Sequence, residues 1–185
     1  MVVMSTLRRH STKLLGPINR RYYASFAVKK HAFAIARREA TKRGFGPGSG
    51  KLIQIVTDGD LDLETYVAEY FPTAMHTMDV MHVIEKLWTA GECFLDEGTA
   101  PLREWIEAQK DHLYAGEIDA ILAELHRRYD AIPRTGPGTK GKRERLHGAI
   151  RYLEKRVAKM PYDKILKLDL ELGTGAVEGA VKNII

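Results

Sequence analysis

Apolar residues recur at two different spacings along the chain, and these spacings separate the expected strands from the expected helices. Residues 52–56 form a short, largely apolar run behind a glycine-rich segment, which predicts a buried strand. Residues 74–80 predict a second strand. Between them, residues 63–71 place their aromatic and aliphatic side chains on one helical face, and Pro72 stops that helix. The pattern therefore predicts a strand–helix–strand unit.

Helical spacing dominates the rest of the chain. Further helices are predicted over about residues 27–43, from Met81 past Trp88, from Pro101 past Ile106, from Ile118 to Tyr129, and over about residues 143–159. A basic loop rich in glycine and proline is expected at residues 133–142. The fold class expected from this mixture is α/β, with a helical stretch inserted between Met81 and about Leu168.

An aspartate stands at the end of each predicted strand. Asp58 follows the first strand directly, and Asp79 lies at or just past the end of the second. If the strands are neighbours joined by a helical crossover, both carboxylates emerge at one edge of the sheet, where open α/β folds place their chemistry. Paired carboxylates at such an edge indicate a metal site. The simpler interpretation is that Asp58-Gly59-Asp60 is a turn, because Asp and Gly favour turns.

A third carboxylate of interest lies near the end of the sequence. Gly173-Thr-Gly175 predicts a tight loop, and Thr174 is placed to cap a following helix with Glu178 in its first turn. Favourable interaction with the helix dipole is sufficient by itself to explain a glutamate at that position.

The net charge of +5 conceals a strong segregation of charge. Residues 1–57 carry 12 basic and one acidic residue, whereas residues 58–124 carry three basic and 16 acidic residues. Residues 125–167 are basic again, with 13 basic and four acidic residues. Basic flanks around an acidic centre suit a protein that binds a polyanion and concentrates carboxylates for a divalent ion. Solvated helix faces give the same pattern.

Length and composition narrow the class of protein further. At 185 residues the chain fits one domain, and its longest uncharged run, residues 70–78, is too short to cross a bilayer. The single cysteine, Cys93, excludes an internal disulfide and is expected in the core. The first 38 residues hold nine Lys or Arg and no acidic residue, a composition shared with organelle transit peptides. An organelle-targeted helical protein is therefore one alternative.

Four segments, taken in order, resemble bacterial insertion-sequence transposases, most closely those of the Kra group. They are Thr57-Asp-Gly-Asp60, Phe71-Pro-Thr-Ala74, Met78-Asp-Val-Met-His82 and Gly173-Thr-Gly-Ala-Val-Glu178. The resemblance extends from about Tyr22 to Ile185 and includes Ala40-Thr-Lys-Arg-Gly44.

This resemblance implies a ribonuclease H-like core with a triad of two aspartates and one glutamate. Asp58 matches a triad aspartate, Glu178 matches the triad glutamate, and Asp79 with His82 match an Asp-x-x-His element beside the site. Within this chain, Asp58, Asp79 and Glu178 form a complete set of catalytic and metal-binding carboxylates, with His82 in support. Alternatively, the family's first aspartate lies on a strand that precedes this sequence.

The chemistry implied by the resemblance is two-metal phosphoryl transfer, in which carboxylates hold two Mg²⁺ or Mn²⁺ ions while DNA is cleaved and joined. The implied partners are transposon ends and target DNA, with no membrane, and a homo-oligomer is allowed. The implied location is cytoplasmic and nucleoid-associated. Basic surfaces at residues 1–43 and 134–159 are expected to hold DNA phosphates.

The chain is accordingly divided into four segments. These are a basic N-terminal segment with a helix (1–50), a strand–helix–strand part of the core (51–82), a helical insertion (83–168) and a terminal helix bearing the glutamate (169–185). Family members are longer and continue past the glutamate helix, so we expect a transposase fragment truncated at both ends. The function expected is DNA strand cleavage and transfer in the full-length family. The alternative is a catalytically inactive remnant that still binds nucleic acid.

Overall fold

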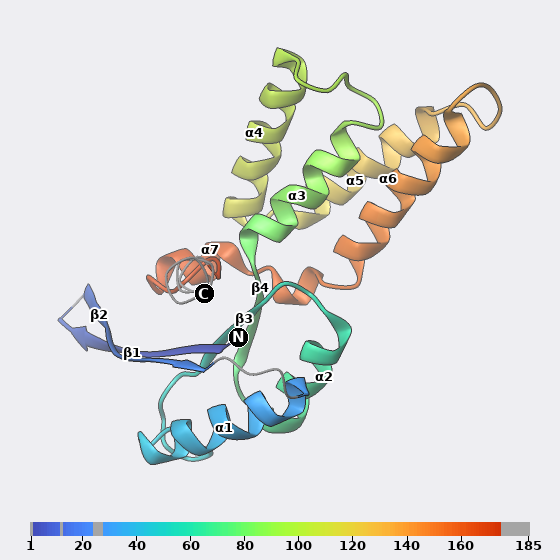
Figure 1. Cartoon of the computed structure of the whole chain (residues 1–185). Helices are drawn as coiled ribbons and strands as arrows, with labels where there is room; N and C mark the ends of the chain where they lie inside the picture. The colour runs from blue at the N-terminus through green and yellow to red at the C-terminus, as the bar shows by residue number, and fades with distance from the viewer. Residues whose placement is uncertain (1, 12, 24–27, 175–185) are drawn as a thin grey trace. The chain divides into compact units, whose positions relative to one another are not determined.

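The computed structural model describes residues 2–11, 13–23 and 28–174, and in this part of the chain it shows a mostly helical α/β structure with two small sheets (Figure 1). The chain divides into two compact units. The N-terminal unit comprises residues 1–77 together with 169–185, and the helical unit comprises residues 78–168.

The N-terminal unit contains both sheets. In chain order its elements are β1 (Val2–His10), β2 (Lys13–Tyr23), α1 (Lys29–Lys42), β3 (Gln54–Thr57), α2 (Leu61–Tyr70) and β4 (Met75–Met78), whose last residue opens the helical unit. β1 pairs with β2, and β3 pairs with β4.

The predicted strand–helix–strand unit is confirmed. The Met75 amide donates to the Ile53 carbonyl at 2.8 Å, and the Thr77 hydroxyl lies 3.5 Å from the Ile55 carbonyl. Because these partners advance together along the chain, β3 and β4 run parallel, with α2 as the crossover between them.

Helices α1 and α2 pack on each other through an aromatic cluster. Phe33 and Ala36 of α1 are buried with Val67 of α2 and with Phe71, and the Phe33 ring lies 5.6 Å from the ring of Tyr66. Around this cluster, Lys29 pairs with Asp60 and Asp62, and Lys30 pairs with Glu69. Some basic residues of the N-terminal segment are therefore paired with acidic residues of the same unit.

The hairpin β1–β2 was missed by the sequence patterns, which placed only a helix within residues 1–50. Its strands pair antiparallel, and His10 pairs with Lys13, so two residues connect them. Two irregularities, between Met4 and Thr6 and between Thr6 and Arg8, shift the register by one residue each. Such bulges break the strict alternation of side chains that would have identified the strands.

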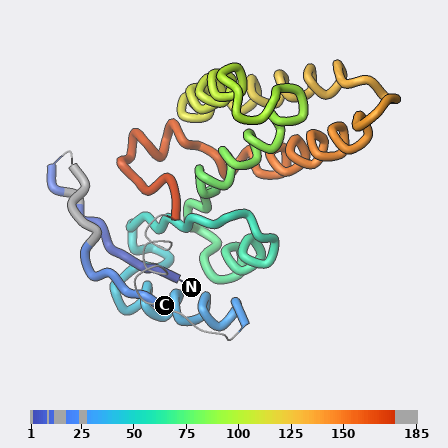
Figure 2. The backbone as a smooth tube through the Cα atoms, turned by 45° about the horizontal axis from the view of Figure 1, so that its top comes forward, coloured from blue at the N-terminus to red at the C-terminus, as the bar shows by residue number. Residues whose placement is uncertain are grey.

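The helical unit is built from five α-helices and a short 3-10 turn (Figures 1 and 2). Its described elements are α3 (Val80–Gly91), α4 (Ala100–Ala115), α5 (Ile118–Ala131), α6 (Thr139–Glu154), η1 (Val157–Lys159) and α7 (Tyr162–Lys167). Helix α6 packs against α3 and α5, while α4 packs against α3, α5 and α7. The helices that share this core bury aliphatic side chains, including Leu87, Leu102, Leu125 and Leu146.

One basic helix begins earlier than its sequence pattern indicates. Helix α6 begins at Thr139, after Gly138 in the left-handed conformation (φ 73°). Arg143, at the expected helix start, lies inside this helix and donates to the Tyr129 and Ile132 carbonyls at 2.8 and 2.7 Å. Its guanidinium also lies 3.9 Å from the centre of the Tyr129 ring. Arg143 therefore satisfies carbonyl groups at the end of α5.

The close approach of α3 and α4 provides a test of this packing. A Cβ atom on Gly91 would lie 2.6 Å from Leu102 Cδ1 and 3.1 Å from the Trp105 ring, and Leu102 is fully buried. Because the core has little room to shift, we expect Gly91→Ala to lower the free energy of unfolding by about 1–3 kcal/mol in urea titrations.

A matched control is available on α6, where a Cβ on Gly148 would meet no atom within 4 Å. Gly148→Ala is expected to raise the free energy of unfolding by about 0.5–1 kcal/mol, because alanine favours the helix. Equal stability of the Gly91→Ala variant and the unmodified protein would contradict the close packing of α3 on α4.

Candidate functional site

Asp58 lies in the turn between β3 and α2. Its side chain is exposed, and its Oδ1 accepts the Asp60 amide at 3.0 Å. Asp60 in turn caps α2 by accepting the Asp62 amide at 2.8 Å, and its hydrogen bond from Lys29 lowers the pKa of the Asp60 carboxyl. The turn interpretation of residues 58–60 is confirmed, and the Asp58 carboxylate remains accessible to solvent.

Next to this turn, polar side chains of β3 contact polar side chains of β4. Thr57 Oγ1 lies 2.9 Å from His76 Nε2, and Gln54 Nε2 donates to Thr77 Oγ1 at 3.2 Å. Gln54 Nε2 also donates to the Glu171 carbonyl at 2.7 Å. This last bond places the segment that leads toward the predicted glutamate helix beside β3. Sequence reasoning missed Gln54 and His76, which stand at positions with no recognisable motif.

Asp79 has a different environment at the start of α3. It is 1% exposed, and its Oδ1 accepts the Met81 amide at 2.8 Å, so it caps the helix. An ionised carboxylate is buried only where polar groups compensate for lost hydration. The helix amide supplies such a partner, and the positive end of the helix dipole adds to it.

Tyr162 of α7 lies near the same helix start and was not singled out in the sequence. It is fully buried, and its hydroxyl donates to the Met78 carbonyl at 3.0 Å. Burial raises the pKa of the Tyr162 phenol, and the charge of Asp79 raises it further. Tyr162 is therefore a neutral hydrogen-bond donor that holds the chain where β4 passes into α3.

His82 lies one turn after Asp79 on α3. Its Nδ1 is 3.7 Å from Asp79 Oδ2, which is too long for a hydrogen bond, and this nitrogen is buried without a hydrogen-bond partner. The imidazole can support the Asp79 charge electrostatically when it is protonated. A role for His82 in catalysis stays a prediction.

The predicted metal-binding residues belong to different parts of the chain. Asp58 belongs to the N-terminal unit, Asp79 belongs to the helical unit, and Glu178 lies outside the described residues. Their convergence on one site stays a prediction.

The described carboxylates do not fit a two-ion site as they stand. Mg²⁺ and Mn²⁺ require several accessible oxygen ligands. In residues 2–11, 13–23 and 28–174, no group of three His, Cys, Asp or Glu side chains is placed to hold a metal ion. Of the two predicted aspartates, Asp79 is closed to solvent and caps a helix, whereas Asp58 is exposed.

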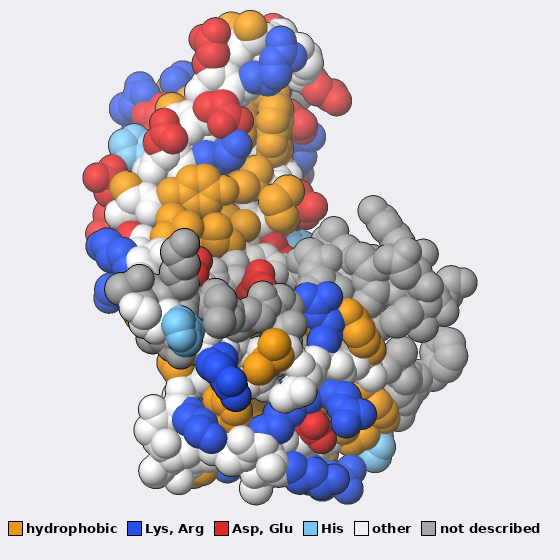
Figure 3. Space-filling view, turned by 90° about the vertical axis from the view of Figure 1, so that its left-hand side faces the viewer, with side chains coloured by type: hydrophobic (Ala, Val, Ile, Leu, Met, Phe, Trp, Pro, Cys, Tyr) orange, Lys and Arg blue, Asp and Glu red, His pale blue; other side chains and the backbone are white. Residues whose placement is uncertain are grey.

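The expected basic surfaces are partly used within the structure. Arg143 binds carbonyls of α5, and Arg156 is 6% exposed with its guanidinium 4.3 Å from the Tyr152 ring centre. Exposed cations remain in both basic segments: Arg8, Arg20, Arg21, Arg38 and Lys42 in the first, and Arg134, Lys140, Lys142, Arg145, Arg151 and Lys155 in the second. Figure 3 shows Lys and Arg side chains prominent over the N-terminal unit, where few acidic side chains interrupt them. These cations can hold phosphate groups.

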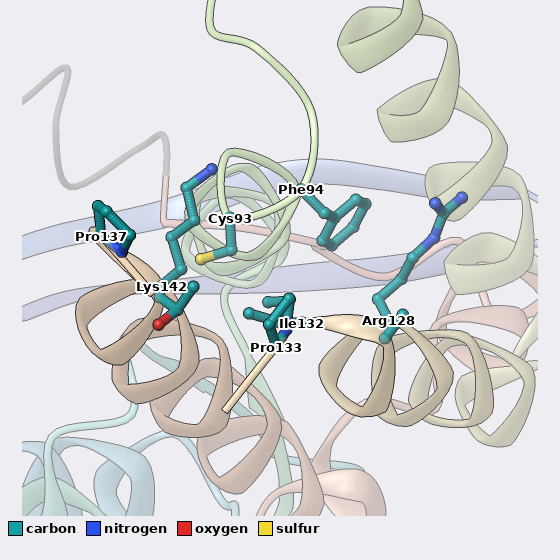
Figure 4. Close-up of a pocket in the computed structure, with 9 residues that line it drawn as sticks. Cys93, Phe94, Arg128, Ile132, Pro133, Pro137 and Lys142 are labelled. Atoms are coloured by element: carbon teal, nitrogen blue, oxygen red, sulfur yellow. The ribbon is translucent and has the colours of Figure 1, made fainter. Parts of the chain in front are cut away.

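A small open pocket of about 270 Å³ lies in the helical unit, between the end of α3, the end of α5 and the start of α6 (Figure 4). Cys93 lines it but is buried, as expected, and burial raises the pKa of its thiol. Arg128, on the opposite wall, pairs with Glu124 and stacks 4.8 Å from the Phe94 ring centre. The Cys93 thiol is protonated and the Arg128 guanidinium is paired, so neither supplies a nucleophile in this pocket.

In the part of the chain that the structure describes, no helix combines the length and apolar character needed to cross a lipid bilayer. Comparisons with protein-family models, with curated proteins and with solved structures find no match to this chain.

The role of Asp79 can be separated into its hydrogen bond and its charge. Asp79→Ala removes the acceptor for the Met81 amide and is expected to lower the free energy of unfolding by about 1 kcal/mol or more. Asp79→Asn keeps a capping oxygen at nearly the same volume, so most of this stability should remain in thermal or urea unfolding. A loss in the asparagine variant equal to that in the alanine variant would show that the charge, and not the cap, is what matters.

Proposed function

We propose that this chain is a DNA-binding protein of the insertion-sequence transposase type, with residues 51–82 and 169–185 forming part of a ribonuclease H-like core. The observation that supports this most directly is the parallel pair β3–β4, with Asp58 and Asp79 directly following its two strands. The bond from Gln54 to the Glu171 carbonyl adds to it, because it draws the third carboxylate-bearing segment toward the same sheet.

The proposed partner is duplex DNA, bound through its phosphates. The exposed cations of both basic segments are suited to a polyanion, and they would hold DNA largely without regard to sequence. The internal ion pairs of Lys29 and Lys30 reduce the number of cations available but leave the hairpin and the later part of α1 basic.

We further propose that the chain by itself has little or no strand-cleavage activity. In the transposase family, divalent ions would supply stabilisation of the attacking and leaving oxygens. Here Asp79 is enclosed and engaged as a helix cap, which leaves the ligand set incomplete among the described residues. Asp58 would retain contact with an ion only as a single, exposed ligand.

DNA binding can be measured with a labelled duplex over a range of salt concentrations. Binding through phosphate contacts releases counterions, so the logarithm of the association constant should fall steeply and linearly with the logarithm of salt concentration. A competitor duplex of unrelated sequence should displace the probe nearly as well as the probe itself. Undetectable binding at low salt, or binding that does not respond to salt, would refute DNA as the partner.

Cleavage is tested separately on supercoiled DNA in Mg²⁺ and in Mn²⁺. The expected result is negligible nicking by the unmodified chain and by its Asp58→Asn and Glu178→Gln variants, with DNA binding retained in all three. Metal-dependent nicking that is lost in both variants would instead establish a functional carboxylate set, and the inactive interpretation would be wrong.

A further inference from the structure

The hairpin β1–β2 is a long two-stranded ribbon supported at one end. Its first residues, Val2 and Met4, pack against the buried cluster that contains Phe33 and Phe71. A two-stranded sheet is only marginally stable in water by itself, so this anchoring is what supports the ribbon. Further along β1, the Arg43 guanidinium donates to Thr6 Oγ1 at 3.2 Å and adds a second attachment to the unit.

The opposite face of the ribbon is polar, basic and aromatic. Val2 and Met4 lie on one face of β1, so Val3 and its cross-strand partner Tyr22 lie on the other. Arg20 lies in the first bulge of β2, and the bond from Arg20 Nη1 to Tyr22 Oη, at 3.2 Å, places it on that face. Tyr22 is 43% exposed and Arg20 is also exposed. The face turned away from the cluster thus presents a guanidinium whose orientation is fixed by a neighbouring phenol.

The charge of the ribbon specifies the kind of molecule that would cover this face. Residues 1–38 contain no acidic side chain. Arg8 and His10, which share the face of Val2 and Met4, are also exposed and lie near the connecting turn. An exposed aromatic side chain among cations, without acidic neighbours in sequence, is complementary to a nucleic acid and not to a basic or neutral protein surface.

The shape of the ribbon favours the groove of a duplex over a flat contact with phosphates. Between successive pairs, β1 advances by two residues while β2 advances by three, and this happens twice: from Met4–Arg21 to Thr6–Ile18, and from there to Arg8–Leu15. Bulges of this kind increase the right-handed twist that two-stranded ribbons already have. Strands lie about 5 Å apart, and the major groove of B-form DNA, about 12 Å wide, admits a two-stranded ribbon.

From these features we propose that the hairpin β1–β2 inserts into the major groove of duplex DNA, with Arg20 directed at the base edges and Tyr22 holding Arg20 in place. This inference rests on the proposed DNA binding and specifies the element that enters the duplex. An arginine has five N–H donors, so Arg20 retains enough after the bond to Tyr22 to contact guanine O6 and N7 together. Duplex RNA is disfavoured, because its major groove is deep and narrow.

The test uses the full chain bound to a guanine-containing DNA duplex, probed with dimethyl sulfate. This reagent methylates guanine N7, which faces the major groove. We expect protection of N7 in the complex, no displacement by distamycin, which occupies the minor groove, and at least roughly tenfold weaker binding to a duplex RNA of the same sequence.

Variants assign the protection to the hairpin. Arg20→Ala should restore N7 methylation and weaken DNA binding roughly tenfold, a change equivalent to one base contact. Tyr22→Phe, which removes only the hydroxyl that orients Arg20, should give a smaller loss. Arg103→Ala removes an equal charge from an exposed position on α4 and should leave protection unchanged.

The outcomes separate this inference from the proposed function. DNA binding with guanine N7 fully reactive, or protection that survives Arg20→Ala, would overturn the placement of the hairpin in the groove while leaving DNA binding intact. Equal affinity for duplex RNA would overturn it as well. Absence of any DNA binding would overturn both proposals together.

Discussion

The burial of one carboxylate at the start of α3 is the constraint on which the helical unit depends. Asp79 is enclosed, and its charge is tolerated because it accepts the Met81 amide at the positive end of the helix. At the residue before Asp79, the Met78 carbonyl accepts a hydrogen bond from Tyr162, which holds α7 to the end of β4. These two bonds hold Met78 and Asp79 in place at the start of α3. The fully buried Val83 and Leu87 then meet the helices that pack against α3.

This constraint affects the function that the sequence motifs suggest, because a carboxylate closed to solvent does not present its oxygens to an ion. A carboxylate that binds a metal ion at a strand end must present its oxygens to the ion. The Asp79 carboxylate instead accepts a hydrogen bond from the first turn of its own helix. Asp58, in the corresponding place after β3, shapes its turn through one oxygen and stays exposed. The two aspartates follow paired parallel strands yet differ in what they can bind. The proposed DNA binding needs neither, since it would rely on exposed cations.

The sequence predicted those elements whose side chains repeat regularly. Helices α3, α4 and α5 follow from aliphatic residues at helical spacing, and β3 and β4 follow from short runs with turn residues at their ends. The sequence did not predict the hairpin, because bulges near Asn19 and Gly16 interrupt the alternation of its side chains. Its arginine-rich composition is also typical of a transit peptide. Nor could spacing show that Asp79 is buried near Tyr162, 83 residues further along the chain, or that Arg143 binds the end of α5. Those facts arise from tertiary contacts between distant segments.

In this structure Asp79 holds the start of α3, and we claim that it is closed to divalent ions. A titration with Mn²⁺, followed by the paramagnetic broadening of backbone amide signals in nuclear magnetic resonance spectra, tests this claim directly. The amide signal of Gly59, which adjoins the exposed Asp58, should broaden equally in the unmodified protein and in the Asp79→Asn variant, and much less in the Asp58→Asn variant. Weaker broadening of Gly59 in the Asp79→Asn variant than in the unmodified protein would contradict the claim, because it would make Asp79 a ligand of the bound ion.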